Sequence, residues 1–183
     1  MISQSRRSLL KAGLGAAALG APMFGAVSAA ADPAPRSLAF HNLHTGESLN
    51  AVYWEKGGYV PDALSAVNHV LRDFRNGAVH TIDPRLLDLL RTLSARVETR
   101  GPFQVISGYR SPATNAILHA HSDGVAKSSL HMQGLAVDIR LGDVDLDRLH
   151  GAALALNGGG VGYYPSSDFV HVDVGRVRRW GGA

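Results

Sequence analysis

Two histidines and one aspartate in the C-terminal part of the chain have the types and spacing of metal ligands. His131 and Asp138 lie in the segment SLHMQGLAVD (129–138), and His171 ends the segment DFVH (168–171). Two imidazoles and one carboxylate suit zinc, and a zinc ion with three protein ligands keeps a fourth position for water, as catalytic sites do. The chain has no cysteine, which excludes a structural zinc bound by thiolates.

The two segments that carry Asp138 and His171 are predicted to be β-strands, and their side-chain alternation tests whether the ligands can meet. In 136–141 the aliphatic residues occupy odd positions, so Asp138 points to the opposite face. In 169–174 the valines occupy even positions, so His171 also points away from the aliphatic row. We expect helices to cover the aliphatic face and the ligands to face a cleft, with His131 supplied by the preceding loop.

The remaining elements must build the sheet that holds these strands. Two strands flanking a glycine-containing turn at 44–47 predict a hairpin. Apolar spacing predicts a helix over 61–76, and Asp83 as N-cap with Pro84 at the first helical position predicts a second helix that ends before Gly101. Further elements are expected as a strand at 103–106, a helix at 112–119, a loop at 120–130, a helix at 145–156 and a hairpin of 161–164 with 169–174. This order is typical of the α+β class, with a mainly antiparallel sheet.

The first 31 residues are predicted to be an export signal. SRRSLLK (5–11) reads as a twin-arginine motif, an apolar stretch rich in Ala and Gly follows, and small residues at 28–31 offer cleavage sites. The apolar stretch is short and weakly hydrophobic for a membrane span, so an uncleaved anchor is the minor alternative. We expect a flexible lead at 32–37, one domain at 38–183, no membrane span in the mature protein, and export to a periplasm.

Removal of this signal changes the charge of the protein. The whole chain has 18 Lys and Arg against 15 Asp and Glu, and the signal holds three of the bases and no acid, so the mature domain is formally neutral. The basic character therefore does not indicate nucleic-acid binding. With no disulfide available, a domain of about 150 residues must rely on its core, its metal, or both.

In order and spacing, these segments resemble the LAS-type zinc peptidases of the hedgehog/D-Ala-D-Ala peptidase superfamily. Segments 129–138 and 168–171 are similar to the two metal-binding motifs of that family, and SGYRS (107–111) is similar to its upstream segment. The opening LAFHNLHTGE (38–47) resembles the start of the YcbK/MepK murein endopeptidase branch. The resemblance covers residues 38–180.

The resemblance implies a hedgehog/DD-peptidase fold, in which an antiparallel sheet carries the site and helices pack on one face. It also implies one zinc ion per chain, bound by His131, Asp138 and His171. The implied reaction is hydrolysis of peptide bonds in peptidoglycan stem peptides, and the YcbK/MepK branch is linked to crosslinks between meso-diaminopimelate residues.

Two residues are expected to act in catalysis. The resemblance puts Asp168 at the position of the carboxylate that takes a proton from zinc-activated water and passes it to the leaving amine, where some members have the longer Glu. Arg110 is expected to bind substrate and stabilise the developing oxyanion. The alternatives are a turn residue for Asp168 and a surface ion pair for Arg110. Asp173 shares a strand face with His171 and is the rival, either as the base or as a partner that holds the imidazole.

Three more residues are expected to contact substrate: Ser107, Tyr109 and Ser129. For Ser129, capping of its own loop is an open alternative. Nearby His119 and His121 are not expected to form a second metal site, because the first site already has its ligands. The sequence thus predicts an exported zinc-dependent murein endopeptidase. The alternatives are a zinc-containing peptidoglycan-binding module without hydrolysis and a D-Ala-D-Ala-type carboxypeptidase. The oligomeric state is left open.

Overall fold

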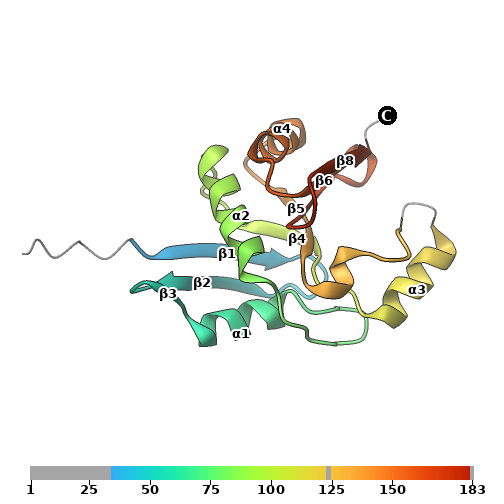
Figure 1. Ribbon diagram of the computed structural model, residues 1–183, viewed down its shortest axis with the longest axis horizontal. Helices are drawn as coiled ribbons and strands as arrows, with labels where there is room; N and C mark the ends of the chain where they lie inside the picture. The colour runs from blue at the N-terminus through green and yellow to red at the C-terminus, as the bar shows by residue number, and fades with distance from the viewer. Residues whose placement is uncertain (1–33, 123–124, 182–183) are drawn as a thin grey trace, which may run out of the picture. The chain divides into compact units, whose positions relative to one another are not determined.

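The computed structural model describes residues 34–122 and 125–181. Within these residues, eight strands form one mixed sheet. The strands are β1 (Arg36–Asn42), β2 (Ser48–Glu55), β3 (Gly58–Tyr59), β4 (Phe103–Ser107), β5 (Ala136–Leu141), β6 (Gly160–Tyr164), β7 (Phe169–Asp173) and β8 (Arg178–Gly181). Their order across the sheet is β3-β2-β1-β4-β5-β7-β6-β8 (Figure 1). The neighbours β1–β4 and β6–β8 are parallel, and the other neighbours are antiparallel. The mainly antiparallel sheet confirms the expected α+β class.

Four helices accompany the sheet in the described part of the chain: α1 (Pro61–Val70), α2 (Pro84–Arg96), α3 (Pro112–His121) and α4 (Leu146–Leu156). Two single-turn 3-10 helices, η1 (Leu130–Gln133) and η2 (Pro165–Ser167), precede β5 and β7. Helix α2 begins as predicted, because the Asp83 carboxylate accepts a hydrogen bond from the Arg85 backbone N–H and Pro84 follows the cap. In Figure 1, α3 lies apart from α2 and α4.

The hydrophobic core lies on one face of the sheet. Helices α1, α2 and α4 each contribute buried side chains to the cluster that also holds Val137, Ile139, Val170 and Val172. These strand residues have the parity predicted from the sequence, so the side chain of Asp138 projects from the opposite face. Burial of the aliphatic face therefore fixes which face of β5 and β7 is available for chemistry.

Helix α1 is shorter than predicted, since it ends at Val70 rather than near residue 76. The Leu71 carbonyl accepts a hydrogen bond from the Tyr109 backbone N–H, at 2.7 Å, instead of from the next helical turn. The buried Asp73 carboxylate then accepts from the backbone N–H of Ser111. Contacts between distant parts of the chain thus end the helix, although its apolar spacing continues.

The start of one strand, β1, and the presence of another, β8, also differ from the prediction. Arg36 and Ser37, assigned to a flexible lead, pair with β2 because the Arg36 guanidinium binds Asp88 and stacks over Trp54. Strand β8 was not predicted at all, since its sequence RRWG lacks an alternating apolar pattern. Strand β1 thus begins earlier than predicted, and β8 adds a strand at the edge of the sheet.

The predicted export signal, residues 1–31, lies outside the described residues. Within 34–122 and 125–181, no helix has the length and apolar character needed to cross a membrane.

Gly108 is predicted to tolerate no side chain. A Cβ there would lie 2.3 Å from the Leu71 carbonyl oxygen, so Gly108→Ala must push apart the loop after α1 and the end of β4. We expect a loss of about 2 kcal/mol or more in the free energy of unfolding, measured by urea denaturation. The control is Gly151→Ala in α4, where nothing lies within 4 Å of the added Cβ and helix propensity favours alanine by about 1 kcal/mol. Equal stability of the two variants would contradict the packing described.

Candidate metal centre and substrate cavity

Three buried side chains converge opposite the core: His131 from η1, Asp138 from β5 and His171 from β7. Asp138 and His171 are direct partners in the register of the two antiparallel strands, so strand pairing alone brings them together. His131 Nε2 lies 3.1 Å from Asp138 Oδ1 and 3.1 Å from His171 Nδ1, and His171 Nδ1 lies 2.8 Å from Asp138 Oδ1. The structure thus brings together the three predicted metal ligands.

In each imidazole, the hydrogen bond made by the nitrogen that points away from the cluster determines whether the other nitrogen has a free lone pair. His131 Nδ1 lies 2.7 Å from the Gly108 carbonyl oxygen, and His171 Nε2 lies 3.0 Å from Asp173 Oδ2. Both partners can only accept, so each of these nitrogens carries the proton of a neutral ring. The remaining nitrogens, His131 Nε2 and His171 Nδ1, therefore direct lone pairs at each other and at the Asp138 carboxylate.

Three acceptor atoms facing one another without a donor repel, and a cation between them removes the repulsion. In a tetrahedral zinc site with bonds of about 2.0–2.1 Å, neighbouring ligand atoms lie about 3.3 Å apart. The separations of 2.8–3.1 Å are close to that value. The donor set and its spacing fit a zinc ion, with His131, Asp138 and His171 as the residues that would hold it.

The charges of the cluster are consistent with this arrangement. Burial alone raises the pKa of Asp138, but the adjacent His131 and His171 outweigh burial and hold that pKa far below its usual range. Burial lowers the pKa of His171, yet its bonds to Asp138 and Asp173 outweigh this and raise the pKa above the ordinary value. Without a metal ion, a proton on His171 Nδ1 would relieve the repulsion within the cluster.

Asp173 holds His171 from behind and is fully buried. Its carboxylate accepts hydrogen bonds from His171 Nε2, the backbone N–H groups of Gly160 and Gly175, and the Arg178 guanidinium. Burial by itself raises the pKa of Asp173, but these donors more than compensate and keep the pKa well below its usual range. Asp173 was considered either as the catalytic base or as the partner that orients the His171 imidazole. These contacts favour the second role.

Arg110 lies beside the acceptor cluster with its bonding capacity partly unused. Its Nη2 lies 3.6 Å from Asp138 Oδ2, and Nη1 donates to Asn115 Oδ1 at 3.4 Å. Its Nε is buried with no hydrogen-bond partner among the described residues. Burial lowers the pKa of the guanidinium, and Asp138 opposes that effect. An arginine remains protonated in such surroundings, so Arg110 offers a desolvated cation with a free donor.

A cavity of about 530 Å³ opens onto the cluster. One wall consists of small and hydroxyl-bearing residues that follow α3, among them Ser128 and Ser129, and the other carries the aromatic rings of Tyr164, Phe169 and Trp180. Ser129 lines the cavity, and its Oγ accepts a hydrogen bond from the His131 backbone N–H, which is the capping role considered for it. His131, Asp138, His171 and Arg110 lie at the inner surface.

Three predicted site residues are not among those that line the cavity. Asp168 adopts a positive φ of 53° at the end of η2, and its exposed carboxylate pairs with Arg140 at 2.5 Å. Ser107 is paired with Asp138 across β4 and β5 but does not line the cavity. Tyr109 stacks on His80 at 4.7 Å and packs against the core, because its backbone is bound to Leu71. Tyr109 is not among the residues that line the cavity, and its expected contact with substrate stays a prediction.

Sequence reasoning missed two parts of the site. Trp180 and Arg178 come from the unpredicted β8. Asn115 on α3 donates hydrogen bonds to the Ala126 and Lys127 carbonyls and accepts one from Arg110. It thus connects the loop that follows α3 to the Arg110 guanidinium. The sequence does place an asparagine five residues after Arg110, but nothing in the pattern assigns it a role.

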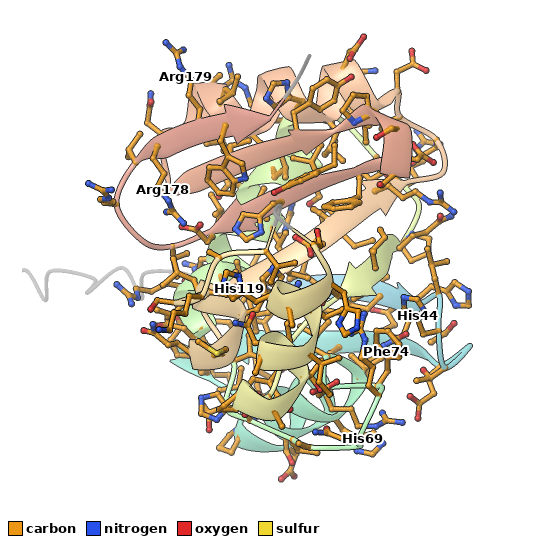
Figure 2. The ribbon with its side chains drawn as sticks, turned by 90° about the vertical axis from the view of Figure 1, so that its right-hand side faces the viewer. His44, His69, Phe74, His119, Arg178 and Arg179 are labelled. Atoms are coloured by element: carbon orange, nitrogen blue, oxygen red, sulfur yellow. The ribbon has the colours of Figure 1, made fainter. Side chains whose placement is uncertain are left out.

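His119 and His121 do not form a second site. Each directs its Nδ1 to a backbone carbonyl, of Val125 and Ile117 respectively. Figure 2 shows His119 on α3. In the described part of the chain, His131, Asp138 and His171 are the one group of three side chains placed to hold a metal ion.

Comparisons with known proteins point to peptidoglycan chemistry. The profile of the family described as Peptidoglycan L,D-endopeptidase MepK matches residues 29–180. The protein named Peptidoglycan L,D-endopeptidase MepK in Escherichia coli (strain K12) is 46% identical over 179 residues, which cover 96% of this chain and 97% of the relative. The Haemophilus influenzae protein named Probable peptidoglycan L,D-endopeptidase MepK is 39% identical over 184 residues, which cover 99% of this chain and 98% of the relative. No solved structure gives a significant match.

Zinc affinity is predicted to rise with pH. The raised pKa of His171 means that a proton competes for the position of the metal ion. As pH rises through that pKa, the proton is lost and Zn²⁺ binds more tightly. Competition titration with a chelating dye between pH 5 and pH 8 should show this trend, with loss of binding in His171→Ala. An affinity independent of pH over that range would contradict the tautomers assigned above.

Replacement of Asp173 is predicted to weaken zinc binding without removing a ligand. In Asp173→Asn the amide cannot supply the carboxylate charge to His171 and Arg178, and we expect a loss of about 10- to 100-fold in Zn²⁺ affinity. The matched control is Asp168→Asn, since Asp168 contacts Arg140 instead of a ligand. If both variants bound Zn²⁺ as the unmodified protein does, the supporting role of Asp173 would be wrong.

Proposed function

Because the chain belongs to the family of the peptidoglycan L,D-endopeptidase MepK, we propose that it is an exported, zinc-dependent murein endopeptidase acting on crosslinks between meso-diaminopimelate residues. The observation that carries the proposal is the convergence of two imidazole lone pairs and one carboxylate at the inner surface of a cavity. Three protein ligands leave a fourth position for water, as expected for a catalytic rather than a structural ion.

A zinc ion held by His131, Asp138 and His171 would supply a Lewis acid for the scissile carbonyl and would lower the pKa of the attacking water. The protein must then stabilise the negative charge that develops on the carbonyl oxygen. Arg110 is suited to this task, because its buried guanidinium has an unpartnered Nε and lies beside Asp138. Its place at the inner surface of the cavity also suits a substrate carboxylate.

Asp168 is the proposed proton carrier, which accepts a proton from the water and delivers it to the leaving amine. It lies between Ser167 and Phe169, which both line the cavity. Its carboxylate is exposed and held by Arg140, a residue on the same strand face as Asp138. Asp173 is less suited to proton transfer, since its carboxylate is buried and already accepts from several donors.

The substrate and the location follow from the family. Peptidoglycan lies outside the cytoplasmic membrane, so the site of action is periplasmic or extracellular. Export by the twin-arginine route, with residues 1–31 removed as a signal, is part of the proposal. Ser129 is proposed to contact the stem peptide from the loop wall. The partner of the protein is thus a crosslinked stem peptide.

Digestion of purified sacculi tests this function. We predict that the mature protein with zinc converts crosslinked dimers into monomers, and that chelation or His171→Ala abolishes the reaction. Mass spectrometry of the released muropeptides identifies the bond that is cut. Release of terminal residues alone would indicate a carboxypeptidase instead. Binding to sacculi without any release, with zinc bound, would indicate a binding module.

The role of Asp168 has a separate test. We expect Asp168→Asn to bind zinc normally and to lose about 10²- to 10⁴-fold in kcat, the usual contribution of a positioned acid–base group. Asp168→Glu, which keeps the carboxylate, should retain more activity than Asp168→Asn. An unchanged kcat in Asp168→Asn would remove this residue from the mechanism.

A further inference from the structure

The aromatic wall, defined as Tyr164, Phe169 and Trp180, adjoins the candidate metal centre. The rings of Tyr164 and Phe169 stack at 4.5 Å, and the Trp180 ring lies 5.0 Å from the His171 ring. All three residues line the cavity. A substrate bound in the cavity beside His171 would therefore lie close to these rings.

Trp180 is held in place by contacts on several sides. Its Nε1 donates to the Tyr164 hydroxyl at 2.8 Å, and the Arg178 guanidinium lies 4.8 Å from its ring centre. Gly162 on β6 leaves room for the indole, because a Cβ there would lie 2.7 Å from the ring. Arg178 is in turn fixed by the buried Asp173. The indole is thus preorganised, and the same Asp173 that orients His171 also anchors it through Arg178.

The other side of the cavity has small side chains instead of aromatic rings. It consists of small residues after α3, including Val125, Ala126 and Ser128. In Figure 2, Arg178 lies on the β8 side of this region and His119 lies on the α3 side. Large flat rings on one side and small side chains on the other suit an extended aliphatic chain better than a compact side chain.

The chemistry of crosslinks supplies such a chain. In a crosslink between two diaminopimelate residues, the residue that gives the scissile carbonyl has a side chain of three methylenes that ends in a carbon bearing an amine and a carboxyl group. In a crosslink made through D-alanine, the corresponding side chain is one methyl group. Burial of methylene groups against aromatic carbon is favourable in proportion to the area removed from water, so the aromatic wall distinguishes the two.

We propose that Trp180, with Tyr164 and Phe169, binds the diaminopimelate side chain of the residue that gives the scissile carbonyl, and so determines specificity for this crosslink. The inference rests on the proposed endopeptidase function and assigns its specificity to one wall of the cavity. Trp180 acts by contact with substrate, whereas Arg178 and Gly162 position Trp180.

The test compares two synthetic crosslinked dimers with zinc-loaded protein. One dimer carries diaminopimelate at the carbonyl side of the scissile bond, and the other carries L-alanine at that position. The unmodified protein should prefer the first dimer by about tenfold or more in kcat/KM, since a difference of even one methylene contributes about that much. In Trp180→Ala kcat/KM should fall more on the diaminopimelate dimer than on the L-alanine dimer, so that the preference is lost, and Trp180→Phe should retain part of it.

The matched control is Trp54→Ala on β2, because Trp54 also lies under an arginine, Arg36, but does not line the cavity. It should keep the preference for diaminopimelate. Equal losses on both dimers in Trp180→Ala and in Trp180→Phe would assign Trp180 a structural role and overturn the inference. A preference that persists in both variants would also overturn it. If the unmodified protein cleaved neither crosslinked dimer, that result would instead contradict the proposed function.

Discussion

The structure depends on three hydrogen-bond acceptors that are forced to face one another. The Gly108 carbonyl fixes the ring of His131, and Asp173 fixes the ring of His171, so both remaining lone pairs point at the Asp138 carboxylate. Such a cluster is unstable by itself, and a bound cation stabilises it. Its atoms are already near zinc-ligand spacing, so little rearrangement is needed when the ion binds. The preorganisation must come from the surrounding fold.

The fold supplies that preorganisation through strand register and close packing. Pairing of β5 with β7 puts Asp138 opposite His171, and burial of the aliphatic row against α1, α2 and α4 prevents either strand from turning over. Gly108 allows the end of β4 to contact Leu71, which positions the carbonyl that holds His131. On the outer side, β8 brings Arg178 to Asp173. The metal ligands are therefore only the inner part of a larger network.

The sequence predicted the parts of this network that depend on local pattern. Side-chain alternation placed Asp138 and His171 on one face, and capping residues placed the start of α2 at Asp83. The early end of α1 was missed because the Leu71 carbonyl bonds to Tyr109, a contact between distant residues. Strand β8 was missed because its apolar content is low, and Trp180 of the aromatic wall was missed with it. The ion pair of Asp168 with Arg140 joins residues 28 positions apart, and no periodicity signals such a contact.

The two imidazoles are held by different neighbours, so we expect them to bind the ion through different nitrogens. Nitrogen-15 NMR of the zinc-loaded protein reports directly which ring nitrogen carries a proton. We predict that His131 binds zinc through Nε2 with a proton on Nδ1, and that His171 binds zinc through Nδ1 with a proton on Nε2. Zinc bound to His171 through Nε2, or spectra in which neither ring changes when zinc is added, would contradict it.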